Sequence, residues 1–339
     1  MICQKHGSSK NEMRLNPFTG EWIIYAPGRS DRPEDKENGP EPDLPAHSYE
    51  TTCPFCPGNE NMLPAILTEI KDKDGKWQVR IVPNRYPAVI SSEQETREFA
   101  GMYMMMKSSG NHEVIIDSPL HNQAIEMMSL KEAGFLIEAY HRRYGDLAKD
   151  RKNKTVILFR NHGKAAGRSL SHPHSQIITL GIIPRAVRVR QSSSLAYRRK
   201  NLHCLLCDII EFELRSKIRL IYENERFVCF VPFTAEVSFE VWIVPKMHRV
   251  DFRDIPDEEK PDFADSIIKV LSILKIKLNA PDYNYVIQGN TSSSGKQNPA
   301  LHWYLQIKPR MAIPAGFEMG SGMHINPSLP ESDAALLKN

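Results

Sequence analysis

The chain has 339 residues, of which 41% are hydrophobic and 25% are charged, a composition typical of soluble globular proteins. Its net charge is +3, which is too small to imply a nucleic-acid or membrane partner but is compatible with anionic small substrates. No apolar run approaches the roughly 18 residues of a membrane helix, and the N-terminus lacks the apolar core of a signal peptide. We therefore expect a cytoplasmic protein with neither nucleic acid nor a membrane as its partner.

The predicted elements, taken in chain order, occur twice. Each half begins with a Cys-x-x-Cys pair and continues with a strand-like stretch, at 80–90 and at 225–233. An alternating apolar strand that ends in a histidine comes next. A helix with apolar residues at three-to-four spacing follows, over 130–150 and over 263–278. After a further strand and a loop containing glycine and serine, each half closes on a second strand that carries a histidine.

This repetition predicts a duplicated α+β unit. Hairpin-like strands separated by a single helix favour antiparallel sheets that helices cover on one face. We place the first unit at 1–183 and the second at 201–339. The polar and basic segment 184–200 is expected to link them as a solvated connector.

Two cysteines and two histidines recur at matching places in the two halves. Thiolate and imidazole ligands together suit a tetrahedral zinc ion, and four protein ligands leave no open position, so such a site stabilises the fold and does not activate water. The alternative is that the cysteine pairs are fortuitous or redox-active. For the second site, zinc and another metal such as iron are both left open. The predicted ligands are Cys53, Cys56, His121 and His172 in the first half and Cys204, Cys207, His248 and His302 in the second.

The segment His172-Pro-His174-Ser-Gln176 is the most informative part of the chain. Side chains alternate along a strand, so these two histidines and the glutamine are expected to point the same way. A neutral imidazole is a good nucleophile for phosphorus near neutral pH, and the Gln176 amide can donate to a phosphoryl oxygen. A zinc-bound His172 cannot be the nucleophile, so we predict that His174 and Gln176 are the catalytic residues. The other interpretation makes His174 a structural residue or an alternative zinc ligand.

The loop before this strand, over 161–169, is small and cationic. Its glycines, Gly163 and Gly167, allow backbone N–H groups to approach phosphate oxygens closely, and Ser169 adds a hydroxyl. We expect this loop to hold the phosphoryl group.

The second half lacks the nucleophile. His302 and Gln306 match the first histidine and the glutamine of the informative segment, but Tyr304 stands at the position of His174. The duplicate therefore keeps the metal ligands and the scaffold, and we expect one active site per chain.

Taken together, these motifs resemble the galactose-1-phosphate uridylyltransferase branch of the histidine-triad superfamily. The resemblance rests on His-Pro-His-Ser-Gln and on Asn161-x-Gly-x-x-x-Gly-x-Ser169 before it. The segments NPFTGEWIIYAPGRSDRP, CPFCPGNE, VPNRYPAV, LHWYLQIKPR and AGFEMGSGMHIN match in order, so the resemblance runs from about residue 14 to residue 326. It implies two tandem histidine-triad-like units and a homodimer with sites near the interface.

The resemblance also implies a ping-pong nucleotidyltransferase that acts on nucleotide sugars. A histidine, here His174, attacks the α-phosphorus and releases a sugar 1-phosphate, and a sugar 1-phosphate or inorganic phosphate then takes the nucleotide. With Gly167 from the loop, the implied substrate-binding residues are Arg29, Arg32 and Ser169 for phosphate, Asn84 and Asn161 for the nucleotide, and Glu318 for sugar hydroxyls.

Two departures from the uridylyltransferases resemble the ADP-glucose phosphorylase subgroup. Ser175 stands where they have glycine or cysteine, and His324 stands where they have glutamine. The sequence leaves open whether the reaction is ADP-glucose phosphorolysis or UDP-hexose exchange. The alternative enzyme is a phosphorylase or hydrolase of dinucleoside polyphosphates. The alternative that is not an enzyme is a zinc-stabilised module that binds nucleic acid through the basic run 184–200.

Overall fold

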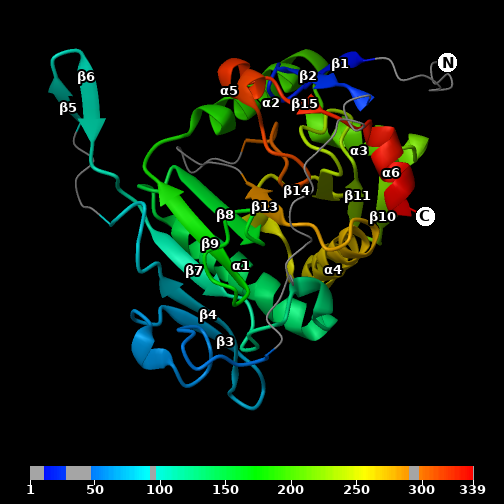
Figure 1. Cartoon of the computed structure of the whole chain (residues 1–339). Coiled ribbons are helices and arrows are strands. Elements are labelled where there is room, and N and C mark those ends of the chain that lie inside the picture. The colour runs from blue at the N-terminus through cyan, green and yellow to red at the C-terminus, as the bar shows by residue number, and fades with distance from the viewer. Residues whose placement is uncertain (1–10, 28–46, 92–96, 290–297, 339) are drawn as a thin grey trace.

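The computed structural model describes residues 11–27, 47–91, 97–289 and 298–338, and its centre is one ten-stranded antiparallel sheet (Figure 1). The strand order is β10-β11-β12-β14-β13-β8-β9-β7-β4-β3. The first half supplies β3 (Thr68–Lys71), β4 (Trp77–Pro83), β7 (His112–Ile116), β8 (Thr155–His162) and β9 (His174–Leu180). The second supplies β10 (Leu220–Glu223), β11 (Phe227–Phe230), β12 (Val241–Pro245), β13 (Tyr283–Gln288) and β14 (Tyr304–Pro309).

The strand order has the internal symmetry that the duplicated sequence predicts. The run β3-β4-β7-β9-β8 in the first half matches β10-β11-β12-β14-β13 in the second. The two five-stranded sets join edge to edge, where β13 pairs with β8 and Tyr285 lies opposite Arg160. The predicted α+β class with antiparallel strands is confirmed, and the two predicted sheets are halves of one.

Two long helices cover one face of this sheet. Helix α1 (Leu130–Lys149) begins at a capping box in which Ser129 and Glu132 bond each other's backbone N–H groups, an arrangement that satisfies two otherwise unpaired donors. Helix α4 (Lys260–Lys277) lies beside it. Their buried apolar side chains form one cluster with inward-facing residues of both halves. Burial of this shared core holds the two halves of the sheet in one body.

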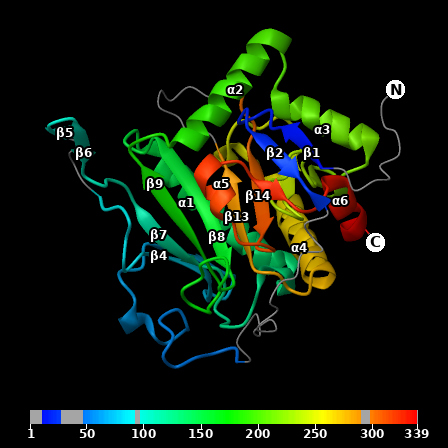
Figure 2. The same cartoon turned by 45° about the horizontal axis from the view of Figure 1, so that its top comes forward.

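The opposite face carries the cysteine segments and two more helices, α2 (Arg185–Asn201) and α3 (Leu205–Ser216) (Figure 2). The segment predicted as a connector is therefore helical over almost its whole length. It ends at Leu202, which adopts a left-handed φ of 65°, a common way to terminate a helix. Few of its side chains are buried, which agrees with its polar composition. The unit boundaries at 183 and 201 stay a prediction.

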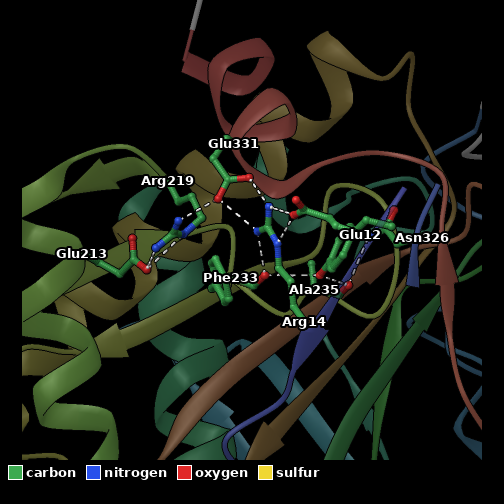
Figure 3. Close-up of polar contacts among 9 residues, drawn as sticks. Glu12, Arg14, Glu213, Arg219, Phe233, Ala235, Asn326 and Glu331 are labelled. Atoms are coloured by element: carbon green, nitrogen blue, oxygen red, sulfur yellow. Dashed lines mark hydrogen bonds and ion pairs between the residues drawn. The ribbon is translucent and has the colours of Figure 1, made fainter. Parts of the chain in front are cut away.

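The two ends of the described chain meet on the second half. Strands β1 (Glu12–Leu15), β2 (Trp22–Tyr25) and β15 (Ile325–Asn326) form a three-stranded sheet next to helix α6 (Pro330–Lys338). Figure 3 shows how ion pairs of the buried Arg14 and Arg219 join these elements to α3. Glu331 pairs with Arg14 at 2.9 Å and with Arg219 at 2.8 Å, and Arg219 also pairs with Glu213 at 2.6 Å.

The remaining elements are short. Strands β5 (Arg97–Ala100) and β6 (Tyr103–Met106) form a hairpin that projects from the body (Figure 1). Helix α5 (Gly316–Ser321) precedes β15, and short 3₁₀ turns cover Glu60–Met62, Ile125–Met127, Phe252–Asp254 and Asp257–Glu259. In the described part of the chain, every helix is too short or too polar to span a bilayer.

Candidate active site

The four predicted ligands of the first half meet in one buried cluster. Cys53 and Cys56 come from the turn that precedes β3, and His121 and His172 follow β7 and precede β9. Their potential ligand atoms all lie within 4.8 Å of one another. The Nδ1 atom of His121 lies 3.3 Å from the Cys56 sulfur, and that of His172 lies 3.6 Å from it.

This cluster has the geometry of a tetrahedral metal site. Zinc bonds of about 2.3 Å to sulfur and about 2.0 Å to nitrogen place neighbouring ligands about 3.5 Å apart. The Nε2 atom of His172 lies 2.8 Å from the Ser118 carbonyl oxygen. A carbonyl only accepts, so Nε2 carries the proton and Nδ1 turns a free lone pair toward the sulfurs. The residues present therefore fit a zinc ion.

The second half repeats this arrangement with Cys204, Cys207, His248 and His302. The Cys207 sulfur lies 3.2 Å from Nδ1 of His248 and 3.4 Å from Nδ1 of His302. The Nε2 atom of His302 faces the Pro245 carbonyl oxygen at 3.1 Å, which again leaves Nδ1 as the ligand atom. Both predicted Cys2His2 sets thus come together as clusters that can hold a metal.

His174 is the first residue of β9 and is almost completely buried. Its Nδ1 atom lies 2.8 Å from the His172 carbonyl oxygen. Because the carbonyl can only accept, Nδ1 carries the proton and Nε2 keeps its lone pair. Burial lowers the pKa of the His174 imidazole to about 4, and the cations Arg160 and Arg168 act in the same direction. The ring is therefore neutral near pH 7, as a nucleophile requires.

His174 opens onto a cavity of about 340 Å³. Asn84, Ser169 and Gln176, all predicted from the sequence, line the same cavity. Its apolar wall includes Phe55, whose ring packs against that of His174 with a centroid separation of 5.6 Å. A concave, mostly apolar site with a few polar groups converging on one nucleophile is typical of a small-molecule binding site.

Because side chains alternate along a strand, Ser175 points to the opposite face of the sheet from His174 and Gln176. Ser175 points into the core, where its hydroxyl lies 2.5 Å from the Tyr140 hydroxyl and 3.2 Å from a carboxylate oxygen of Asp117. Asp117 forms a fully buried ion pair with Arg160 of β8. This polar network anchors β9 on the face of the sheet opposite the His174 cavity.

The loop predicted to hold phosphate folds back on β8 and β13. The Ala165 N–H donates to Asp282 at 2.6 Å, and the Gly167 N–H donates to the Lys164 carbonyl oxygen at 2.9 Å. Asn161 lies beneath this loop, where its amide oxygen accepts from Asn284 at 2.8 Å. Neither Asn161 nor Gly167 lines the cavity at His174, whereas Ser169 does.

Three predicted substrate-binding residues lie elsewhere. Arg29 and Arg32 fall outside the described residues. Glu318 lies in α5 and does not line the His174 cavity. Its carboxylate accepts from the Ala315 N–H at 3.0 Å and from the Ile325 N–H at 3.1 Å.

The duplicated position in the second half is closed. The Tyr304 ring is buried in a cluster of three aromatic rings, where it lies at a centroid separation of 4.4 Å from Trp242 and 6.4 Å from Phe18. The Gln306 amide donates to the buried carboxylate of Glu240 at 2.7 Å. These contacts fill the place that corresponds to the His174 cavity of the first half.

A larger cavity, of about 950 Å³, lies between β1, α3 and β11. The described residues that line it include neither a histidine nor a cysteine, and its arginines are paired with glutamates. Volume alone therefore does not locate the chemistry, and the smaller cavity at His174 is the candidate active site.

Sequence reasoning missed one residue at this site, His112 at the start of β7. Its Nε2 atom lies 2.8 Å from the side-chain oxygen of Gln176. The signal was the cross-strand register, in which Val114 of β7 lies opposite Gln176 and His112, two residues before Val114, lies on the same face.

Comparison with known proteins decides the family. Residues 3–184 match the N-terminal domain of galactose-1-phosphate uridyl transferase, and residues 213–306 match the HIT domain. The chain belongs to the galactose-1-phosphate uridylyltransferase family. It is 34% identical to the ADP-glucose phosphorylase of Arabidopsis thaliana, over 96% of this chain and 92% of the relative. It is 27% identical to the galactose-1-phosphate uridylyltransferase of Thermotoga maritima, over 96% and 98% of the two chains.

Solved structures of the family agree with this assignment. A crystal structure of the Arabidopsis thaliana ADP-glucose phosphorylase with bound ADP-glucose matches with a TM-score of 0.84 and 31% identity, over 97% of this chain and 99% of that one. A uridylyltransferase structure matches with a TM-score of 0.75 and 28% identity, over 96% and 97%. The predicted family, its two-unit fold and its activity class of hexose-1-phosphate nucleotidyl transfer are confirmed.

Proposed function

We propose that this protein transfers an adenylyl group from ADP-glucose to inorganic phosphate through an adduct on His174. The lone pair of Nε2 attacks the α-phosphorus, a phosphorus–nitrogen bond forms, and the bond to the bridging oxygen breaks, so that glucose 1-phosphate leaves. A phosphate oxygen then attacks the same phosphorus, the phosphorus–nitrogen bond breaks, and ADP leaves. The single observation that carries the proposal is that His174 donates from Nδ1 to a backbone carbonyl and leaves Nε2 for the cavity.

The polar residues around His174 suit the charge that develops during transfer. The Gln176 amide and the Ser169 hydroxyl line the cavity beside the nucleophile. Donors fixed before the reaction stabilise negative charge on phosphoryl oxygens without having to reorganise. Asn84 lies on the same wall and is suited to contact the nucleotide.

The similarity of the chain to an ADP-glucose phosphorylase favours adenine over uracil as the base of the substrate. Sequence identity is 34% to the ADP-glucose phosphorylase and 27% to the Thermotoga maritima uridylyltransferase, and the TM-scores are 0.84 and 0.75. Ser175, one of the two positions at which the sequence resembles the ADP-glucose phosphorylase subgroup, belongs to the buried hydrogen-bond network of Tyr140 and Asp117.

Steady-state turnover tests the choice of base and acceptor. One assay supplies ADP-glucose with inorganic phosphate, and the other supplies UDP-glucose with galactose 1-phosphate. We expect the first pair to give the higher kcat/KM by at least about ten-fold, since buried polar groups that contact one base are left unpaired by the other. Faster turnover of the second pair would replace the proposal with uridylyl exchange.

We propose that each Cys2His2 cluster binds zinc. A bound ion would join the cysteine turn to the sheet and, in the first half, hold His172 so that its carbonyl meets His174. The free thiols of Cys53, Cys56, Cys204 and Cys207 suit a reducing compartment such as the cytoplasm. Metal analysis of the purified protein tests this, and fewer than two zinc ions per chain would contradict it.

We also infer a homodimer in which each chain completes the site of the other. Glu318, which the family resemblance assigns to the sugar, lies outside the His174 cavity of its own chain. A neighbouring subunit can supply such a residue when the interface passes near the cavity. Light scattering tests the dimer. Mixing His174→Ala and Glu318→Ala chains, each inactive alone, should restore part of the turnover if the sites are shared.

A further inference from the structure

We propose that His112 is a positioning residue that sets the orientation of the Gln176 amide and aims its NH₂ group at the transferred phosphoryl group. This inference rests on the proposed function, because it assigns the amide a phosphoryl oxygen as its partner. His112 itself does not line the cavity. It acts through Gln176, to which it lies at hydrogen-bond distance.

The hydrogen bonds of His112 define its tautomer. The backbone N–H of Ala88 donates to its Nδ1 atom at 3.0 Å. A backbone N–H can only donate, so Nδ1 carries no proton and the proton of the neutral ring is on Nε2. Nε2 lies 2.8 Å from Oε1 of Gln176. The Nε2–H group therefore donates to the side-chain carbonyl oxygen of the glutamine.

A second donor meets the same oxygen. The side-chain oxygen of Asn84 accepts from the Tyr86 N–H at 2.8 Å, which fixes its NH₂ group on the other side. That NH₂ group lies 3.5 Å from Oε1 of Gln176 and 3.1 Å from Nε2 of His112. The Asn84 NH₂ group and the Nε2 atom of His112 lie close to each other because both donate to Oε1 of Gln176. With its oxygen bound by two donors, the Gln176 amide has its NH₂ group left for the cavity, which Gln176 lines together with His174.

The second half shows the opposite arrangement at the matching positions. Val114 lies opposite Gln176 in the first half, and Trp242 lies opposite Gln306 in the second. Two residues before each of these stand His112 and Glu240. Glu240 accepts from the NH₂ group of Gln306 at 2.7 Å, and the oxygen of Gln306 accepts from Gln288 at 2.8 Å.

One position therefore decides which end of the glutamine amide is held. A donor there, as in His112, binds the oxygen and frees the NH₂ group. An acceptor there, as in Glu240, binds the NH₂ group, so that this group cannot donate to a ligand. An amide oxygen presented to a phosphoryl group would repel it, whereas the NH₂ group stabilises the charge of its oxygens.

Variants at His112 test the proposal by the single-turnover rate of adenylyl transfer from ADP-glucose. Removing one such donor costs about 10²–10³ in rate, and we expect this loss for Gln176→Ala. His112→Phe, which leaves the amide unheld, should lose at least about ten-fold. His112→Glu, which copies the second half, should fall to the level of Gln176→Ala. His112→Gln keeps a donor at the same reach without the Ala88 contact and should restore the rate to within about three-fold of the wild type.

A double-variant cycle separates positioning from a general structural effect. If His112 acts through Gln176, adding His112→Phe to Gln176→Ala should cause no further loss of rate. Losses that multiply would show that His112 acts independently of the glutamine and would overturn the proposal. So would a His112→Gln variant as slow as His112→Phe.

A measurement that needs no activity separates this proposal from the proposed function. Long-range ¹H–¹⁵N correlation spectra of the wild-type protein report which ring nitrogen of His112 carries the proton. We expect the Nε2–H tautomer, and the Nδ1–H tautomer would overturn the proposal whatever the enzyme's substrate. Absence of an adenylyl adduct in the wild type, with the Nε2–H tautomer present, would instead refute the proposed function.

Discussion

The Nδ1 atom of His174 donates to the carbonyl oxygen of His172 at 2.8 Å, so a residue of the first Cys2His2 cluster also fixes the tautomer of the proposed nucleophile. Orientation of a reactive side chain by a neighbouring fixed group is how an active site keeps its geometry before substrate binds. The cluster and the chemistry are therefore coupled in the first half. In the second half Tyr304 stands at the position of His174, so the second Cys2His2 cluster has no histidine nucleophile to orient.

This asymmetry predicts different results for the two metal clusters. Cys53→Ser should remove the metal of the first half, lower the melting temperature, and slow adduct formation by at least about ten-fold, because His172 loses its anchor. Cys204→Ser should also lower the melting temperature but leave adduct formation by folded protein within about three-fold of the wild type. Metal content and the single-turnover rate check both variants. Equal losses of rate would argue against the coupling.

The number of active sites is expected to stay at one per chain even when the missing histidine is restored. In Tyr304→His the new ring would still lie beside Trp242 and Phe18, and the Gln306 amide would still be bound to Glu240. We predict no more than one nucleotide per chain by intact mass after incubation with ADP-glucose. A second adduct in this variant would mean that the site in the second half is open.

The two loop glycines should differ in their tolerance of alanine. At Gly163, where φ is 83°, an added Cβ would lie 1.7 Å from an oxygen of Asp282. At Gly167, where φ is 85°, the nearest neighbour would be 4.0 Å away. Both variants incur left-handed backbone strain of about 1–2 kcal/mol, but only Gly163→Ala displaces the carboxylate that holds the loop. We predict the larger loss of turnover for Gly163→Ala, and equal losses would contradict the steric argument.

The ion pairs beside the larger cavity should matter for stability. Glu213 is buried and holds Arg219 at 2.6 Å, and removing one partner of a buried pair costs about 3–5 kcal/mol. Because Arg219 keeps its ion pair with Glu331, we predict a loss near the lower end of this range, about 2–3 kcal/mol, for Glu213→Ala in urea unfolding. Glu12→Ala is the matched control, because Glu12 is 38% exposed in its pair with Arg14 and should cost less than about 1 kcal/mol. Similar losses in the two variants would contradict the assignment.

The sequence predicted the parts of this site that depend on residue type and spacing. The Cys2His2 sets could be found because thiolate and imidazole pairs recur in both halves, and the structure brings each set within 4.8 Å. His174 and Gln176 could be placed in one cavity because side chains on a strand alternate. Helices α1 and α4 followed from their apolar periodicity.

Features that depend on contacts between distant segments could not be predicted. The joint between β8 and β13 has no local pattern, since backbone groups at any strand edge can pair. The polar composition of 184–200 favoured a connector, although the structure has a helix over Arg185–Asn201. No sequence pattern marks His112, because its partners are distant in sequence and meet it only in the fold: Ala88 lies in the segment after β4, and Gln176 lies on β9.

The account rests on a covalent nucleotide at one nitrogen of His174, and peptide mapping after brief incubation with ADP-glucose and quenching in base measures this directly. We predict an adenylyl group on the peptide that contains His174, at its imidazole, in the wild type and no adenylyl group in His174→Ala. An adenylyl group on another residue, one that persists in His174→Ala, or none in a wild type that still consumes ADP-glucose would contradict the mechanism.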